Sequence, residues 1–215
     1  MSKSQKISTQ TPLTAEDSFR EEVLSAYRSF AKDIHYNTSK TPFDDHHSVN
    51  GFVSVGLWTL DFLSSPGKFR RGIAAIGGLG TGKTLAMLTL ARTINHFIPR
   101  YIVHVFPAHR LSSLFMKGGI EGIDKICGYQ HIVLDDIGAS PVVSHYGTSL
   151  NLHEYIIAER NHINTAEPKE YPLITHITTN TGSVSEAIGK RAASRLAAMT
   201  EIVAFNGTTD KRLPE

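Results

Sequence analysis

Cysteine is almost absent from this sequence, because Cys127 is the only one among 215 residues. A single cysteine excludes a disulfide within the chain and any metal site made of several thiolates. We expect Cys127 to be a small buried side chain rather than a nucleophile. The eleven histidines are scattered, and none forms a His-x-x-x-His pair at ligand spacing beside carboxylates. We therefore expect no dedicated zinc site.

Long apolar runs are also missing. No stretch approaches the roughly 20 residues that a membrane-spanning helix needs, and the N-terminal MSKSQKISTQTP has no apolar core of the kind found in secretory signal peptides. The net charge is only +2, from 22 basic and 20 acidic side chains. That balance neither demands nor excludes a nucleic-acid partner. We expect a soluble, cytoplasmic protein that does not act at a membrane.

The composition that remains is ordinary for a globular protein, with 40% hydrophobic and 20% charged residues. At this length it predicts one sizeable domain, or one domain with a small extension. We place the boundary at residue 50, so that residues 1–50 form a tail and helical extension and residues 51–215 form the core.

The extension begins with 13 polar residues that predict a disordered tail. Thr14 can cap the helix that follows, and this helix has one apolar face, formed by Phe19, Val23, Tyr27, Phe30 and Ile34. That face either packs on the main domain or docks on another protein. Residues 37–50 have the composition of a loop, and residues 52–63 predict a second, strongly apolar helix.

The most informative stretch is IAAIGGLGTGKT, from Ile73 to Thr84. A buried strand runs into a complete G-x-x-x-x-G-K-[ST] loop, and a helical pattern starts directly after it, as the phosphate-binding loop requires. Lys83 is expected to reach the β- and γ-phosphates, and the Thr84 hydroxyl to bind Mg²⁺. A glycine-rich turn without a ligand is the alternative, but a chance match of this length is rare. The expected nucleotide contacts are Gly77, Gly78, Gly80, Thr81, Gly82, Lys83, Thr84 and Leu85.

Strands and helices alternate along the rest of the chain. Strands are expected near 101–106, 131–136, 173–180 and 201–205, and helices near 108–116, 120–126, 147–164, 184–188 and 191–199. This alternation predicts an α/β fold with a parallel sheet covered by helices on both faces. Ligands of such sheets bind at the carboxyl ends of the strands.

Polar side chains follow two of these strands. Asp135 and Asp136 end an apolar strand, where Asp135 is expected to hold Mg²⁺ and Asp136 to orient or deprotonate the attacking water. Asn180 ends another strand, and its amide can sense the γ-phosphate. Two aspartates capping a turn, and turn chemistry in Thr-Thr-Asn, are the structural alternatives.

Three arginines are candidates for stabilising charge on phosphate oxygens. Arg191 and Arg195 lie four residues apart on one helix face, and either can act within the chain or on a neighbouring subunit; solvated surface arginines are the alternative. Arg160 is a weaker candidate. The basic residues Lys68, Arg70, Arg71 and Lys117 are candidates for contacting DNA on the basis of charge alone.

The segments GGLGTGKT, HIVLDDIG, THITTN and GKRAASRL carry a family resemblance. Together they resemble the AAA+ ATPases of the DnaC/DnaI helicase-loader and IstB transposition-helper group, over roughly residues 52–212. The resemblance implies a P-loop AAA+ fold with Lys83 and Thr84 as Walker A contacts, Asp135 and Asp136 as Walker B, and Asn180 as sensor 1. It assigns Arg191 and Arg195 to the arginine segment of the family.

The same resemblance implies a function. It implies ATP and Mg²⁺ as cofactors, slow hydrolysis, ATP-dependent assembly into a homo-oligomer, binding of single-stranded DNA and contact with a replicative helicase. The N-terminal helix then becomes the candidate partner-binding element. The alternatives are a transposition helper that acts on duplex DNA with a transposase, a small-molecule P-loop kinase, and a switch that binds ATP without hydrolysing it.

Overall fold

The structure is a computed structural model of the whole chain. It describes residues 14–39, 50–139, 143–145, 148–166, 170–180 and 184–206. The expected tail at residues 1–13 and most of the expected loop, residues 40–49, lie outside the described residues.

Five parallel strands form the central sheet, in the order β2-β3-β6-β1-β7. Their bounds are Gly72–Gly77 for β1, Val103–Pro107 for β2, His131–Ile137 for β3, Ile174–Thr179 for β6 and Thr200–Phe205 for β7. Strands β1, β3 and β6 are buried along most of their length because helices cover both faces of the sheet. The expected parallel α/β sheet is therefore confirmed.

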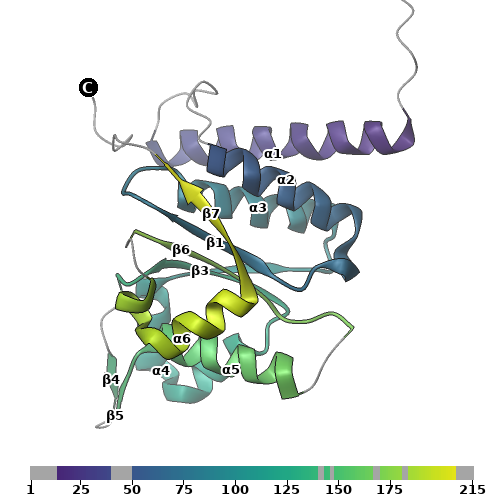
Figure 1. Cartoon of the computed structure of the whole chain (residues 1–215). Helices are drawn as coiled ribbons and strands as arrows, with labels where there is room; N and C mark the ends of the chain where they lie inside the picture. The colour runs from purple at the N-terminus through teal and green to yellow at the C-terminus, as the bar shows by residue number, and fades with distance from the viewer. Residues whose placement is uncertain are drawn as a thin grey trace, which may run out of the picture.

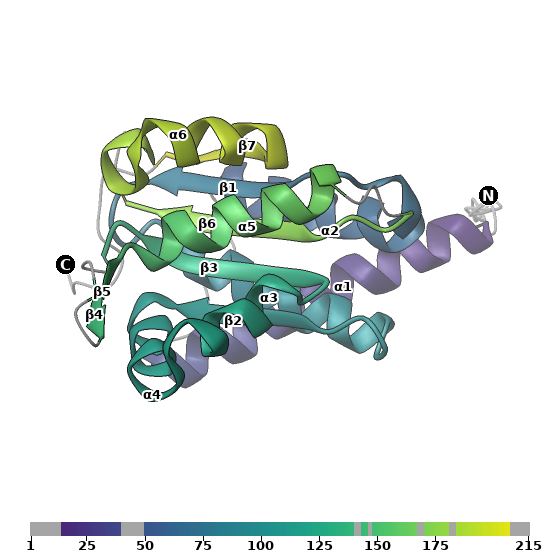
Figure 2. The ribbon, with the colours of Figure 1, turned by 90° about the horizontal axis from the view of Figure 1, so that it is seen from below.

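Helices cover both faces of the sheet (Figure 1). One face packs against α2 (Asn50–Ser64) and α3 (Lys83–Phe97), and α1 (Ala15–Ser39) packs on the outer side of these two helices. A short 3₁₀ helix at Pro66–Lys68 leads into β1. The other face packs against α4 (Ala108–Cys127), α5 (Leu152–Ala166) and α6 (Val184–Met199), which lie across the strands in Figure 2. Among the helices of the described ranges, none has the length and apolar character to cross a membrane.

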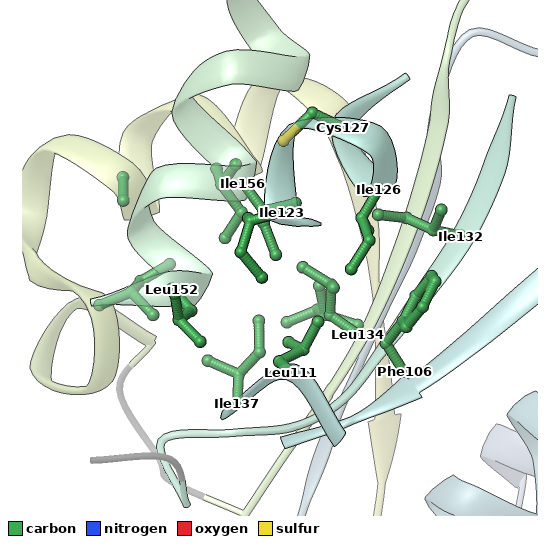
Figure 3. Close-up of a cluster of buried hydrophobic side chains, with 14 of the residues drawn as sticks. Phe106, Leu111, Ile123, Ile126, Cys127, Ile132, Leu134, Ile137, Leu152 and Ile156 are labelled. Atoms are coloured by element: carbon green, nitrogen blue, oxygen red, sulfur yellow. The ribbon is translucent and has the colours of Figure 1, made fainter. Parts of the chain in front are cut away.

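The two faces have separate apolar cores. Under α4 to α6, side chains such as Leu111, Ile123, Leu134 and Ile156 converge from the helices and from β3 (Figure 3). Cys127 belongs to this core, where burial raises the pKa of its thiol to about 12. A thiol held neutral in this way is a poor nucleophile.

Two helices are interrupted at glycines where the sequence predicted separate segments. Gly119 (φ 57°) breaks α4, and Gly189 (φ 79°) breaks α6. One prediction was wrong, because the helix expected from residue 147 begins only at Leu152. Residues Val143–His145 (β4) and Thr148–Leu150 (β5) pair as a small antiparallel sheet instead. The Asn151 side chain then accepts the Glu154 N–H and sets the helix start.

The N-terminal helix α1 packs on the domain. Val23, Tyr27 and Ala31 are buried against α2 and α3, and the Phe19 ring meets Phe97 edge to face at 6.0 Å. Arg92 on α3 lies 4.5 Å from the centre of the Phe30 ring. Of the two alternatives for this apolar face, packing within the fold is therefore the one that the structure shows. Thr14 caps the helix as expected, by accepting the Asp17 N–H.

A pair of fully buried histidines joins three strands on the α1–α3 side. The Ile73 N–H donates to His176 Nδ1 at 3.0 Å, so the neutral ring carries its proton on Nε2, which contacts His131 Nε2. Aromatic rings surround the pair, and the ring centres of Trp58 and His176 lie 4.8 Å apart. Burial lowers the pKa of His176 to about 3, and the Arg160 cation acts in the same direction. Burial, His176 and Arg160 likewise lower the pKa of His131.

These buried histidines predict a loss of stability in mild acid. In the unfolded chain a histidine titrates near its ordinary pKa of about 6.5, whereas folded His131 and His176 stay neutral. His153 behaves alike, because burial lowers its pKa to about 4. As the pH falls from about 6.5 to about 5, the unfolded state gains protons that the folded state does not. The free energy of unfolding should fall by up to about 1.4 kcal/mol per pH unit for each histidine, as measured by urea denaturation.

A pair of variants isolates the effect. Among the described residues, His153 Nε2 is buried without a hydrogen-bond partner, so His153→Met should keep the fold. It should also remove the contribution of one histidine from the pH dependence of the free energy of unfolding. The same change at exposed His109 should leave the parent profile intact. Identical profiles for His153→Met and the parent protein would contradict the prediction.

Candidate functional site

The predicted phosphate loop links the end of β1 to the start of α3. Gly80 (φ 68°) and Gly82 (φ 90°) adopt left-handed conformations that side chains rarely allow. Gly82 is the N-cap of α3 and provides no side-chain acceptor, so the loop turns backbone N–H groups and the positive end of a helix outward. Gly77 is glycine for a different reason, because a Cβ there would lie 2.2 Å from the Phe205 carbonyl oxygen on β7.

Lys83 is a nearly buried cation inside this loop. Its Nζ donates to the carbonyl oxygens of Gly77 at 2.9 Å and Gly78 at 2.5 Å, and lies 3.3 Å from the Thr81 hydroxyl. These partners are neutral oxygens of the loop itself, so they do not cancel the lysine charge. Leu85 lies half-buried in the first turn of α3. A positive, N–H-lined loop fits a polyphosphate.

Two oxygen ligands of the kind that Mg²⁺ prefers meet beside the loop. The Thr84 hydroxyl, in the first turn of α3, donates to Asp135 Oδ1 at 2.9 Å, and Asp135 is 92% buried at the end of β3. The described residues contain no cluster of three or more histidine, cysteine, aspartate or glutamate side chains that could enclose a metal. One carboxylate and one hydroxyl suit Mg²⁺, which usually keeps waters and takes its remaining ligands from phosphates.

Asp136 has an unusual backbone. Its φ is 65°, which makes it the only described residue other than glycine with a positive φ. The side chain of Asn180, at the end of β6, donates to Asp136 Oδ1 at 2.7 Å. The structure thus brings together Lys83, Thr84, Asp135, Asp136 and Asn180 at the carboxyl edge of the sheet, where the sequence placed them.

The sequence analysis missed Thr178. Its hydroxyl donates to Asp135 Oδ1 at 2.7 Å and accepts the Asp136 N–H at 2.8 Å. Threonine is a common strand residue, and Thr178 lies in a run of strand-forming residues, so its type gave no signal. Only its place two residues before Asn180, on the strand next to the Asp-Asp pair, pointed to it.

The late arginines do not join this group. Arg191 is exposed and Arg195 half-buried on α6, beyond the break at Gly189. Among the described residues, neither guanidinium hydrogen-bonds to Asp135, Asp136 or Asn180. Their expected role stays a prediction.

Two arginines of the basic cluster before β1 hydrogen-bond to backbone carbonyls of the domain. The Arg71 guanidinium donates to the carbonyl oxygens of Ala197 at 2.7 Å and Thr200 at 2.5 Å, and Arg70 donates to Glu170 O at 2.8 Å. These arginines clamp the amino-terminal end of β1, opposite the phosphate loop. That position makes them poor candidates for a DNA contact near the nucleotide site.

The chain shares its α/β fold with several solved structures. It is similar to the crystal structure of DnaI, with a TM-score of 0.60 and 17% identity over 89% of this chain and 93% of that one. It is also similar to the DnaC helicase loader, with a TM-score of 0.57 and 19% identity over 84% and 98% of the two chains.

A third similar structure is the replication initiator DnaA bound to AMPPCP and single-stranded DNA. Its TM-score is 0.52, with 16% identity over 72% of this chain and 46% of that one. No protein-family model and no curated protein matches the chain. At these identities the likeness establishes the fold, and the chemistry must be argued from the site.

The structure excludes Arg160 from the catalytic candidates. The side chain is fully buried on α5 and donates to three backbone carbonyls, at Cys127, Tyr129 and Ile174, and to the Thr175 hydroxyl. Cys127 is the last residue of α4, so the guanidinium stabilises the negative end of that helix. Burial lowers the pKa of Arg160 to about 10, which leaves it charged at neutral pH.

Replacing Arg160 therefore tests a structural role. Arg160→Met should lower the free energy of unfolding by about 2–4 kcal/mol, because several buried carbonyls lose their donor. Exposed Arg100 provides the matched control, and Arg100→Met should change stability by less than about 0.5 kcal/mol. Chemical denaturation measures both. Equal, small effects for the two variants would show that the buried contacts of Arg160 contribute little.

Proposed function

We propose that this protein binds ATP with Mg²⁺ and hydrolyses the ATP slowly. The observation that carries the proposal is the hydrogen-bonded group at the carboxyl edge of the sheet. It joins the phosphate loop to Asp135 through Thr84 and joins Asp136 to Asn180. A glycine-rich turn with structural aspartates would not need a lysine buried inside the loop.

Each residue has a role in this proposal. The loop residues Gly77, Gly78, Gly80, Thr81 and Gly82, with Leu85 in the first helical turn, bind phosphates through their N–H groups. Lys83 contributes its charge to the β- and γ-phosphates. Thr84 and Asp135 hold Mg²⁺, which neutralises developing charge on the phosphate oxygens when bound.

Asp136 and Asn180 deal with the attacking water. The Asp136 carboxylate accepts a proton from the water or orients it, and Asn180 positions both the carboxylate and a γ-phosphate oxygen. The hydrogen bond between the two side chains supports a shared role at one substrate group. Arg191 or Arg195 supplies a guanidinium, from the same chain or from a neighbouring subunit of an ATP-dependent homo-oligomer.

We further propose that the protein uses ATP to load a replicative helicase on single-stranded DNA. The support is the similarity to a DnaC helicase loader, which extends over 98% of that chain, and the similarity to a DnaA structure bound to single-stranded DNA. The partner-binding element in this proposal is α1. Because its apolar face is buried within the domain, the docking surface must be its outer, charged face.

Substitutions at the site separate nucleotide binding from hydrolysis. Lys83→Ala should abolish binding of a fluorescent ATP analogue. Asp136→Asn should retain binding and lower steady-state hydrolysis by about 100-fold or more, as expected for loss of a general base. An ATPase rate unchanged by Asp136→Asn would refute the assigned role.

Mixing Arg195→Ala with Lys83→Ala protein should restore part of the ATPase rate if Arg195 acts across a subunit interface.

Capture of the host's replicative helicase tests the loader role. Deleting the first 50 residues would uncover the apolar side chains that α1 buries, so charge reversal on its exposed face is the sharper change. We expect ATP-dependent capture by the parent protein, loss of capture in Glu21→Lys/Arg28→Glu, and normal capture in the control Glu121→Lys/Lys125→Glu on α4.

The same pull-down distinguishes the competing functions. Failure of the parent protein to capture the helicase with either ATP or ADP would contradict the loader role. A transposase would then be the next partner to test, together with duplex DNA.

A further inference from the structure

We infer that Thr178 is a positioning residue of the nucleotide site, whose hydroxyl fixes Asp135 and Asp136 relative to each other and thereby sets the affinity for Mg²⁺. The inference rests on the proposed ATP–Mg²⁺ binding. It concerns a residue whose hydroxyl, among the described residues, hydrogen-bonds to the two aspartates, so that Thr178 acts through them.

The hydroxyl of Thr178 is held in place by two hydrogen bonds. Its hydrogen goes to Asp135 Oδ1 and its oxygen accepts the Asp136 N–H, at 2.7 and 2.8 Å. The residue is 99% buried, so water cannot replace either bond easily. One side chain therefore connects the side chain of Asp135 with the backbone of Asp136.

A bulge in the sheet explains why this connection is needed. Strands β3 and β6 pair Leu134 with Ile177 and then Ile137 with Thr179, so that both aspartates face the single residue Thr178. The extra residue is accommodated by the left-handed backbone of Asp136, a conformation that is unfavourable at a residue other than glycine. At this bulge the Asp136 N–H donates to the Thr178 hydroxyl instead of a backbone carbonyl of the neighbouring strand.

Asp135 depends on the same hydroxyl. Its Oδ1 receives two hydroxyl donors, Thr84 from α3 and Thr178 from β6. Thr84 is expected to turn its oxygen toward the cation and so to release Asp135. Thr178 is then the donor that continues to orient this carboxylate. Loss of the Thr178 hydroxyl should weaken Mg²⁺ binding more than it weakens the contacts of the loop with phosphate.

The neighbouring threonine provides a matched control. Thr179 is also buried on β6, but the hydrogen bond that its hydroxyl donates within the described residues goes to the Ile137 carbonyl, at 3.0 Å, and not to an aspartate. Thr178→Val and Thr179→Val thus remove the same group from adjacent positions of one strand. Only the first change breaks the link between the carboxylates.

The test is the Mg²⁺ dependence of nucleotide binding, followed with a fluorescent ATP analogue and the full-length protein. Thr178→Val should raise the Mg²⁺ concentration for half-maximal enhancement of binding by about 10- to 100-fold, the usual effect of losing a residue that orients a metal ligand. Binding measured in EDTA should stay at the parent level. Thr179→Val should resemble the parent protein, and Thr178→Ser, which keeps the hydroxyl, should restore most of the Mg²⁺ affinity.

Two results would overturn the inference. One is a Mg²⁺ dependence of Thr178→Val equal to that of the parent protein, and the other is an equal shift in both valine variants, which would indicate general loosening of β6. If Thr178→Val does not fold, Thr178→Ser and Thr178→Ala decide the matter, because they differ only in the hydroxyl. A parent protein that binds no nucleotide at any Mg²⁺ concentration would instead refute the proposed function on which the inference rests.

Discussion

The hydrogen bonds to the Asp135 carboxylate hold the parts of the candidate site together. An ionised group with so little exposure is stable only when its oxygens are hydrogen-bonded or bound to a cation. Here Thr84 and Thr178 donate to the same oxygen, one from the helix after the phosphate loop and one from β6. Because β6 lies between β1 and β3 in the sheet, this carboxylate can be satisfied only when all three strands have assembled in register. Formation of the sheet and formation of the site are thus the same event.

The two faces of the sheet are organised differently. On one side, aromatic rings of α2 lie against a neutral histidine pair, and α1 packs on α3, the helix that starts at the phosphate loop. On the other side lies a mainly aliphatic core under α4 to α6 (Figure 3). The buried Arg160 donates to the backbone carbonyl of Cys127, a member of that core. The N-terminal helix is therefore part of the domain, which limits any docking role to its charged outer face.

Local patterns were enough to predict the sheet, most helices and the five converging site residues, because apolar runs, glycines and terminal polar residues act over a few positions. Thr178 and Arg160 could not be predicted in the same way. The role of Thr178 comes from a bulge in which two residues of β3 face one residue of β6. The role of Arg160 comes from carbonyl groups on α4 and β6 that only the folded chain brings together. Strand β5 was taken for the start of a helix because its three residues carry no clear alternation.

The buried arginine also has a consequence for cooperativity. Its guanidinium comes from α5, and its acceptors are the end of α4 and the start of β6. If α5 docked before either of the other two, it would bury a cation without its full set of oxygens, at a cost of several kcal/mol. Partly assembled states of this kind are too high in free energy to be populated. The end of α4, α5 and the first half of β6 therefore open and close as one unit. This holds although more than 40 residues of sequence separate the end of α4 from the start of β6.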